Sequence, residues 1–274
     1  MPEGPEIKIA ADKIAKAIAS KPIKEIFFAF EHLKPYEEIL TRQLITGVDT
    51  KGKGMLIRFD NNLSIYSHNQ LYGKWMIRNA YDYPDTNRQL RLAIHNEHKS
   101  ALLYSASDID VLDKNAIAIH PFLSRLGLDV LDSNTTIKKV KARLLHKSFH
   151  RRRFTSLFLD QRFLAGLGNY LRSEILFVAR VHPTLRPLDC SQKQISALAK
   201  AAIKVPQQSY QTKGITNDLQ LVEHLKKQGY RRKDYRHWVF GREERPCYVC
   251  NNPIIKDVSG GRRYYFCPQC QIVI

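Results

Sequence analysis

The middle of the chain contains a glycine-rich stretch, Phe163-Leu164-Ala165-Gly166-Leu167-Gly168-Asn169-Tyr170-Leu171. Its two glycines and its asparagine tolerate positive φ angles, so they permit a tight turn between two helices. The backbone amides of such a turn can bind a phosphate group. A glycine-rich helix junction is a weak signal by itself, so its interpretation depends on the segments around it.

Helical patterns lie on both sides of this stretch. On its N-terminal side, residues 135–146 carry Ile137, Val140 and Leu144 at helical spacing. On its C-terminal side, Ser191-Gln192-Lys193-Gln194 has the pattern of a capping box, followed by apolar residues on one face. We therefore predict a helical domain over residues 126–225, built around a helix–two-turns–helix element.

The chain before this domain is rich in short β-prone runs, at residues 23–30, 55–59, 63–67, 75–78, 90–95 and 101–104. Several short strands at this spacing are typical of a sandwich or a barrel. A helix is expected before them over residues 5–19, because Pro5 suits a first turn and Ile7, Ile14 and Ile18 recur on one face. Residues 1–125 are therefore predicted to form a β-sandwich domain with a leading helix.

The end of the chain contains four of the five cysteines, Cys247, Cys250, Cys267 and Cys270. Two Cys-x-x-Cys pairs can complete a tetrahedral zinc shell, and the sixteen residues between them fall within the range of known zinc sites. Two disulfides are the alternative, but nothing suggests secretion. Residues 226–274 are therefore expected to form a basic flank, or linker, and a zinc finger whose metal supplies much of the folding energy. Cys190 is interpreted as an ordinary thiol.

The predicted fold class is thus α+β and multidomain. The 44 Lys and Arg residues outnumber the 26 Asp and Glu residues and give a formal net charge of +18. This balance favours nucleic acid as partner, with a ribosome-like or merely basic protein as the alternative. No apolar stretch is long enough for a membrane span, and the N-terminus lacks the features of a secretory signal. We expect a soluble, cytoplasmic protein.

Four motifs together resemble the formamidopyrimidine-DNA glycosylase and endonuclease VIII family. They are the opening Met1-Pro2-Glu3-Gly4-Pro5-Glu6, then Lys51-Gly52-Lys53-Gly54, then residues 163–171, and finally the four cysteines. They occur in the order of the family, from residue 1 to 272. The resemblance implies a bifunctional DNA glycosylase and abasic-site lyase of base excision repair. Departures from the family pattern are the long, basic segment 205–237 and the pair Arg262-Arg263, which compete for one role in the finger.

The stretch Gln70-Leu71-Tyr72 resembles the endonuclease VIII branch of the family, which inserts this group into the DNA helix. The resemblance therefore implies excision of oxidised pyrimidines, followed by β,δ-elimination. The purine-directed branch, which excises 8-oxoguanine and formamidopyrimidines, is the alternative, and it typically carries Met and Arg there. A packed position of Leu71 and Tyr72 in the sandwich core is the structural alternative.

The resemblance also implies the catalytic residues. Removal of Met1 would leave Pro2 with a secondary amine, and an α-amino pKa near 8 leaves more free amine than a lysine pKa of about 10.4. Glu3 would move protons at the sugar, unless it is only an acid favoured at a helix N-terminus. Lys53 would contact phosphate and assist base loss, whereas Lys51 is interpreted as a solvated charge.

Phosphate binding is expected from Arg125, Asn169 and Arg262. Arg262 matches the arginine of the family finger in register counted from Cys267, and Arg263 is the second choice. The expected partner is damaged double-stranded DNA, bound by a monomer that carries one structural zinc ion and no small-molecule cofactor. A functional alternative of another class is a non-catalytic zinc-ribbon protein that binds nucleic acid, in which Pro2, Glu3 and Lys53 would be idle.

Overall fold

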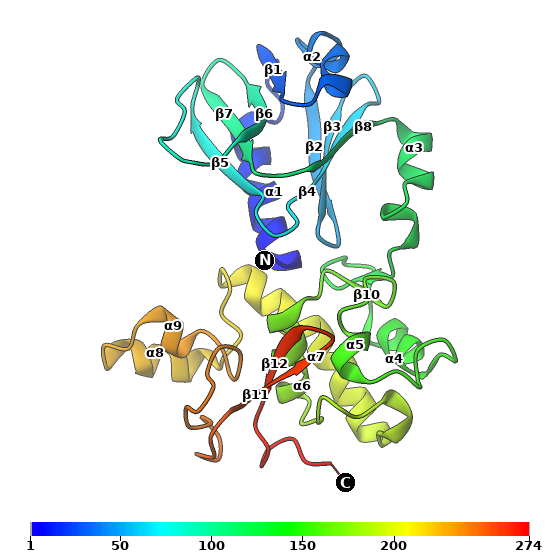
Figure 1. Cartoon of the computed structure of the whole chain (residues 1–274), viewed down its shortest axis with the longest axis vertical. Coiled ribbons are helices and arrows are strands. Elements are labelled where there is room, and N and C mark those ends of the chain that lie inside the picture. Colours follow the sequence, from blue (N-terminus) through cyan, green and yellow to red (C-terminus); the bar gives the residue numbers. More distant parts are fainter. Residues whose placement is uncertain (1, 274) are drawn as a thin grey trace. The chain divides into compact units, whose positions relative to one another are not determined.

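The computed structural model describes residues 2–273, so Met1, whose removal the sequence analysis expects, lies outside the described residues. The chain divides into two compact units, one up to Arg125 and one from Leu126 onward (Figure 1). This division falls at the first boundary that the sequence suggests.

The N-terminal unit contains helix α1 (Gly4–Ile18) and two antiparallel four-stranded sheets. One sheet has the order β1 (Glu25–Phe28), β6 (Leu90–His95), β7 (Lys99–Tyr104), β5 (Lys74–Asn79). The other has the order β2 (Ile45–Lys51), β3 (Gly54–Phe59), β4 (Ser64–His68), β8 (Asp108–Leu112). One apolar core combines α1 with side chains of both sheets, so the predicted sandwich with its leading helix is confirmed.

Short elements that the sequence analysis did not predict complete this unit. Strands β2 and β8 form the edges of the second sheet, and β8 is only five residues long. Two helices are also new, α2 (Pro35–Leu40) and α3 (Lys114–Ile119), together with the 3-10 turns at Glu31–Leu33 and Leu123–Arg125.

The second unit is mainly helical. Its helices are α4 (Ile137–Leu145), α5 (Phe154–Leu157), α6 (Asn169–Val178), α7 (Gln192–Gln211), α8 (Leu219–Lys227) and α9 (Arg232–Tyr235). A 3-10 turn at Pro187–Asp189 and a parallel pair of short strands, β9 (Leu128–Asp129) and β10 (Leu164–Ala165), connect them. The predicted capping box is present, because the Ser191 hydroxyl accepts from the Gln194 backbone and Gln194 Oε1 accepts from the Ser191 backbone.

The segment 224–246, interpreted from its composition as a linker or basic flank, is folded against this unit. Helix α8 continues past residue 225, where the sequence suggested a domain boundary. After α9, the backbone N–H groups of Trp238, Val239 and Phe240 donate to the buried carboxylate of Glu174 on α6, at 2.8 to 2.9 Å. Composition alone suggested a solvated segment, whereas one buried acid far away in the sequence orders it.

The finger follows as a hairpin of β11 (Ile255–Ser259) and β12 (Arg262–Phe266), and it packs on α6 (Figure 1). The Tyr265 N–H donates to the Ser173 hydroxyl of α6 at 3.1 Å. A small apolar core joins Phe177 of that helix to the finger residues Ile254 and Tyr265. The finger is therefore attached to the helical unit by both hydrogen bonds and apolar burial.

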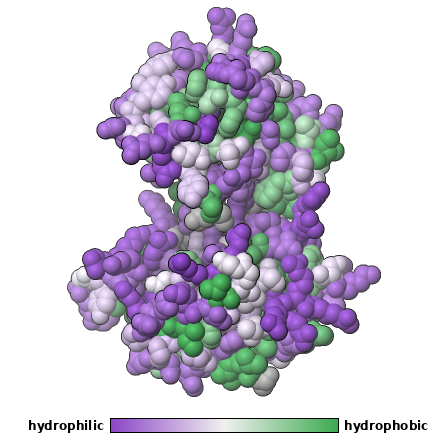
Figure 2. Space-filling view, in the orientation of Figure 1, coloured by the Kyte–Doolittle hydropathy of each residue, from purple (hydrophilic) through white to green (hydrophobic). Residues whose placement is uncertain are grey.

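The face of the molecule shown in Figure 2 is mostly hydrophilic over both units, with apolar residues scattered among the polar ones. Among residues 2–273, no helix combines the length and the apolar composition that a membrane crossing requires.

Candidate active site and metal centre

The chain begins its first helix with the residues that the sequence analysis singles out. Glu3 is the N-cap of α1, and its side chain is almost completely buried. The Glu3 N–H donates to Oε2 of Glu6 at 3.0 Å, so Glu6 closes the first turn. Pro2, half-buried, lies immediately before this cap. The cap fixes the backbone on which the expected nucleophile is carried, and it gives Glu6 a structural role.

Lys53 occupies the turn between β2 and β3, which consists of Gly52 and Lys53 alone. Gly52 has a φ of +60°, a conformation that favours glycine. Gly54 packs against the ring of Tyr66, because a Cβ there would lie 2.8 Å from Cε2 of that ring. The glycines therefore serve the turn and the packing. Lys53 is only 7% exposed although it lies in a turn, whereas Lys51 is exposed.

The stretch Gln70-Leu71-Tyr72 lies in the loop that connects β4 with β5 and therefore joins the two sheets. Leu71 is 63% exposed and Tyr72 is 71% exposed, so neither belongs to the sandwich core. Residues 69–73, called the insertion loop below, are closed by the Gly73 N–H, which donates to the Asn69 carbonyl at 2.7 Å. A Cβ on Gly73 would lie 2.6 Å from the Asn69 backbone, so this closure requires glycine.

The Lys53 turn and the insertion loop are neighbours. Gly54 pairs with His68 in the β3–β4 ladder, so Lys53 precedes one member of this pair and Asn69 follows the other. The positive charge of Lys53 contributes to a lowered pKa of His68, for which burial of the ring is the largest cause. Helix α1 contacts β2, β3 and β5, the strands that flank these two loops. The N-terminal unit thus gathers a buried amine, an exposed apolar wedge and an aromatic ring.

Three residues outside the predicted site support the insertion loop. Nδ1 of His68 accepts from the Gln70 N–H at 3.1 Å, and the Ser107 hydroxyl donates to Oε1 of Gln70 at 3.0 Å. Nη1 of Arg88 donates to the Tyr72 carbonyl at 2.5 Å. Ser107 and Arg88 are distant in sequence from the loop, so no local pattern could have predicted these contacts.

Two of the expected phosphate-binding residues, Asn169 and Arg125, lie at a helix start and at a 3-10 turn. Asn169 is the first residue of α6, where the helix dipole favours an anion. The preceding turn is held by Gln161, whose Oε1 accepts from the Gly166 N–H and whose Nε2 donates to the Leu167 carbonyl. Arg125 is exposed at the end of the other unit.

The finger hairpin has the tip that the sequence analysis expects. Gly260 and Gly261 have φ angles of +55° and +71°, and Arg262 pairs with Ser259 directly beside them. Both Arg262 and Arg263 are exposed. Arg172 of α6, which is buried, donates from Nη2 to the Arg263 carbonyl at 2.8 Å. This contact from the helix holds the strand that carries both arginines near the tip of the hairpin.

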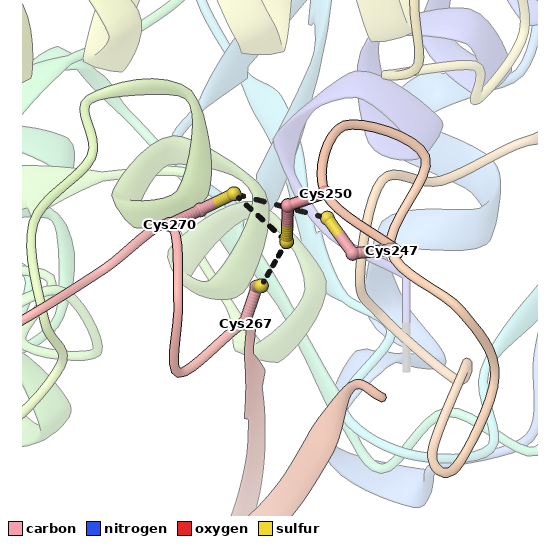
Figure 3. Close-up of side chains that lie close together, drawn as sticks. All are labelled: Cys247, Cys250, Cys267 and Cys270. Atoms are coloured by element: carbon pink, nitrogen blue, oxygen red, sulfur yellow. Dashed lines mark hydrogen bonds between the residues drawn. The ribbon is translucent and has the colours of Figure 1, made fainter. Parts of the chain in front are cut away.

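The four cysteines converge at the base of the finger (Figure 3). Their Sγ atoms all lie within 4.8 Å of one another, and three of the separations are 3.4, 3.5 and 3.9 Å. Four sulfurs at about 2.3 Å from a tetrahedral zinc ion are separated by about 3.8 Å, so this group fits the ion. None of the four forms a disulfide.

The pKa values of the thiols also favour the binding of a cation. Although burial opposes ionisation, hydrogen bonds from the Asn252 backbone and from neighbouring thiols lower the pKa of Cys250 to about 6. The pKa of Cys270 is instead raised, mainly by burial and further by its contacts with the neighbouring thiols, because negative charges in so small a volume repel one another. A divalent metal ion would remove this repulsion, which explains why so compact a cluster can be stable.

Comparisons with known proteins agree with this arrangement. Residues 1–107 match the formamidopyrimidine-DNA glycosylase N-terminal domain, and residues 126–220 match the formamidopyrimidine-DNA glycosylase H2TH domain. The chain is 44% identical to "Endonuclease 8" of Salmonella enteritidis PT4 over 271 residues, 99% of this chain and 100% of the relative. "Endonuclease 8" of Salmonella heidelberg is equally similar, with the same coverage.

Solved structures show the same fold at lower identity. The Lactococcus lactis Fpg in complex with abasic-site DNA aligns with a TM-score of 0.81 at 19% identity, covering 98% of this chain and 99% of that one. A structure of MutM with DNA containing carbocyclic 8-oxo-G also aligns with a TM-score of 0.81 at 19% identity, covering 99% and 100%.

Proposed function

This chain belongs to the formamidopyrimidine-DNA glycosylase and endonuclease VIII family, and from that membership we propose a specific reaction for its site. The protein is a bifunctional DNA glycosylase and abasic-site lyase of base excision repair. Its proposed substrates are oxidised pyrimidines in double-stranded DNA. The observation that carries the proposal is the Gly54–His68 pairing, which makes the buried Lys53 amine a neighbour of the exposed insertion loop.

In the proposed reaction, the nitrogen of Pro2 attacks C1′ of the damaged nucleotide once Met1 has been removed. The bond between C1′ and the base breaks, and the base leaves with a proton. The Pro2 nitrogen then gives up its proton, its lone pair breaks the bond between C1′ and O4′, and O4′ takes up a proton as the sugar ring opens. The product is an iminium whose nitrogen carries no proton, so it remains cationic and acidifies C2′. Loss of the C2′ proton breaks the bond from C3′ to its phosphate. A second elimination then breaks the bond from C5′ to its phosphate.

The other residues support these steps. Glu3 moves protons as the sugar ring opens, and its burial beside the helix start limits competition from water. Lys53 contacts phosphate and assists base loss. Gln70, Leu71 and Tyr72 fill the space that the extruded nucleotide leaves, since a base within the stack cannot be attacked at C1′. Arg125, Asn169 and Arg262 bind phosphates, and Arg262 also assists the second elimination.

The cysteine group is proposed to hold one structural zinc ion, which would fix the base of the finger without taking part in the reaction. We also propose that the protein acts as a monomer in the bacterial cytoplasm.

Two measurements test this function. Matched duplexes that carry thymine glycol, dihydrouracil or 8-oxoguanine should be cleaved in favour of the two pyrimidine lesions, and a preference for 8-oxoguanine would instead support the purine-directed alternative. Borohydride should trap the processed chain on damaged DNA through the Pro2 nitrogen. Mapping of the adduct to Lys53 would contradict the proposed nucleophile.

A further inference from the structure

Helices α8 and α9 meet at an exposed basic turn. The eight residues concerned, called the basic tip below, are Lys226-Lys227-Gln228-Gly229-Tyr230-Arg231-Arg232-Lys233. Five of them are cations, none is an acid, and all eight are exposed. Gly229, with a φ of +81°, ends α8, because its N–H donates to the Lys226 carbonyl and the Tyr230 N–H donates to the Leu225 carbonyl.

Two acids near the basic tip pair with its cations, Glu223 with Lys226 and Asp234 with Arg231, the latter at 3.9 Å. Asp218 caps α8 by accepting from the Leu221 N–H at 2.9 Å, and Glu223 pairs with Lys226 at 2.6 Å. Asp234 pairs with Arg245, which lowers the pKa of Asp234. Within residues 2–273, neither Lys227 nor Lys233 forms an ion pair. The positive charge of the tip is therefore only partly neutralised by the protein itself.

The basic tip is held on the metal centre. Beneath it lies an apolar cluster of Ile215, Val222, Leu225 and Tyr235, against which Tyr248 packs. The Tyr248 hydroxyl donates to the Asp234 carbonyl at 2.6 Å. Tyr248 lies between the metal ligands Cys247 and Cys250. The tip and the base of the finger are thus parts of one packed body, although α8 and α9 project from the helical unit (Figure 1).

We infer that the basic tip is an additional DNA contact surface, which binds backbone phosphates of the duplex away from the lesion. The inference rests on the proposed function, because it concerns how the same substrate is held. A solvated protein surface usually mixes charges of both signs, whereas this one presents five cations without an acid. Two of the cations are arginines, whose planar forks match phosphate. The Tyr230 ring between them and the end of α8 is 51% exposed.

Cations near the C-terminus of α8 also complement the helix dipole, which accounts for Lys226 and Lys227. The dipole does not account for Arg231, Arg232 and Lys233, which follow the end of that helix. Because the tip is packed on the finger, phosphates bound at the tip would help to align the finger on the duplex. Removal of the tip cations should therefore weaken binding while leaving the bond-breaking steps intact.

The test is the salt dependence of binding. The triple variant Lys227→Gln, Arg231→Gln and Lys233→Gln leaves Lys226 and Arg232, which bond within the protein, in place. The matched control is Lys193→Gln, Lys200→Gln and Lys204→Gln, which removes three exposed cations from α7 in the same unit. Binding to a duplex with a tetrahydrofuran abasic analogue is measured over a series of salt concentrations.

We expect the slope of log K against log[salt] to become shallower by about 0.9 for each phosphate that the tip variant no longer binds. Affinity at low salt should fall about tenfold or more, since the electrostatic attraction to phosphate is strongest under these conditions. Single-turnover cleavage at saturating enzyme should match that of the native chain. The control should keep the native slope. Zinc content and melting temperature should be the same in all three proteins.

An unchanged slope in the tip variant overturns the inference, and so does an equal change in the control, which would indicate net charge alone. Borohydride trapping of the native chain separates this result from the proposed function. If the native chain forms no trapped adduct, the proposed function fails. If the native chain forms the adduct and the tip variant has the same slope as the native chain, only the inferred contact surface is contradicted.

Discussion

The backbone N–H of Gln70 donates to Nδ1 of His68 at 3.1 Å, and this bond holds the start of the insertion loop. Gln70 has a φ of +47°, a left-handed conformation that costs about 1 to 3 kcal/mol in a residue other than glycine. Burial lowers the pKa of His68, so the ring is neutral and Nδ1 can accept the bond. The loop is therefore held in shape before DNA is bound, which reduces the entropic cost of binding.

His68→Ala should lower kcat/KM for excision of an oxidised pyrimidine several-fold, because loss of one hydrogen bond in a loop costs about 0.5 to 1.5 kcal/mol. His68→Asn should restore most of this activity, since an Asn side chain offers Oδ1 as an acceptor to the N–H two residues later. Cleavage of a pre-formed abasic site should be less affected by either change. Equal activity of the Ala and Asn variants would contradict a positioning role for His68.

A second prediction concerns pH and His95. Burial is the main cause that lowers the pKa of this ring from 6.5, and the ring is hydrogen-bonded to Ser100 and Tyr83. Below pH 6.5 the unfolded chain binds a proton that the native chain does not, so this contribution to stability is present above 6.5 and is lost as pH falls. The limiting slope is about 1.4 kcal/mol per pH unit for one such group.

His95→Gln should therefore reduce the loss of unfolding free energy between neutral and acidic pH, although it lowers stability at neutral pH. Urea denaturation at several pH values measures this slope. His98→Asn, at a position outside the buried core, is the matched control. A slope that is the same in His95→Gln as in the native chain would show that His95 does not account for the acid sensitivity.

A substitution at Gly54 tests the packing of this glycine, which follows Lys53, against the Tyr66 ring. A Cβ at this position would lie 2.8 Å from the buried Tyr66 ring, so Gly54→Ala should destabilise the N-terminal unit by about 1 to 3 kcal/mol. Gly47→Ala in the adjacent strand is the control, because a Cβ there has nothing within 4 Å. Urea denaturation should show a lower stability for Gly54→Ala and no decrease for Gly47→Ala. A neutral Gly54→Ala would mean that the ring can move aside.

The sequence predicted the elements whose pattern is local. The first helix, six of the strand runs and the cysteine cluster follow from periodicity and spacing, and the fold class followed from their order. The edge strand β2 was missed because Gly47 and Thr50 interrupt its apolar pattern. The folded conformation of the segment 224–246 could not be predicted locally because it depends on Glu174, a buried acid on a helix far away in the sequence.

The candidate site likewise contains residues that a local pattern predicts and residues that it does not. Pro2, Glu3, Lys53 and the insertion loop belong to short motifs, so they could be named from the sequence together with the family resemblance. Arg88, Ser107 and Arg172 act through long-range contacts with the Tyr72 carbonyl, the Gln70 side chain and the Arg263 carbonyl. Polar residues of this kind are common in any sequence, so only the folded chain distinguishes them.

Metal removal gives a further prediction. One zinc ion should bind per chain, and a chelator should weaken DNA binding while the N-terminal unit, whose core is separate, stays folded. Cys250→Ser should lose the metal. Cys190→Ser should retain it, because burial raises the pKa of the Cys190 thiol to about 11 and the cluster does not include this residue. Zinc content and limited proteolysis measure both effects. Full activity of a zinc-free preparation would contradict the assignment.

The last prediction concerns the two arginines beside the finger tip. Arg262 is the first residue after Gly260 and Gly261, and side chains alternate along a strand, so Arg262 and Arg263 point to opposite faces of the hairpin. A guanidinium can bind two phosphate oxygens at once, which a lysine cannot match in geometry. Arg262→Ala should therefore impair excision and the second elimination far more than Arg263→Ala does.

The control for these two variants is that the strand which carries both arginines stays intact. Arg172 bonds to the carbonyl of residue 263, not to its side chain, so Arg263→Ala leaves the backbone contact to α6 in place. Both variants should keep the fold and the metal, and both should still form the borohydride adduct on a pre-formed abasic site, because that step depends on Pro2. Product analysis separates β- from δ-elimination in each variant. If Arg263→Ala loses δ-elimination and Arg262→Ala keeps it, the functional register of the finger is one residue later than proposed.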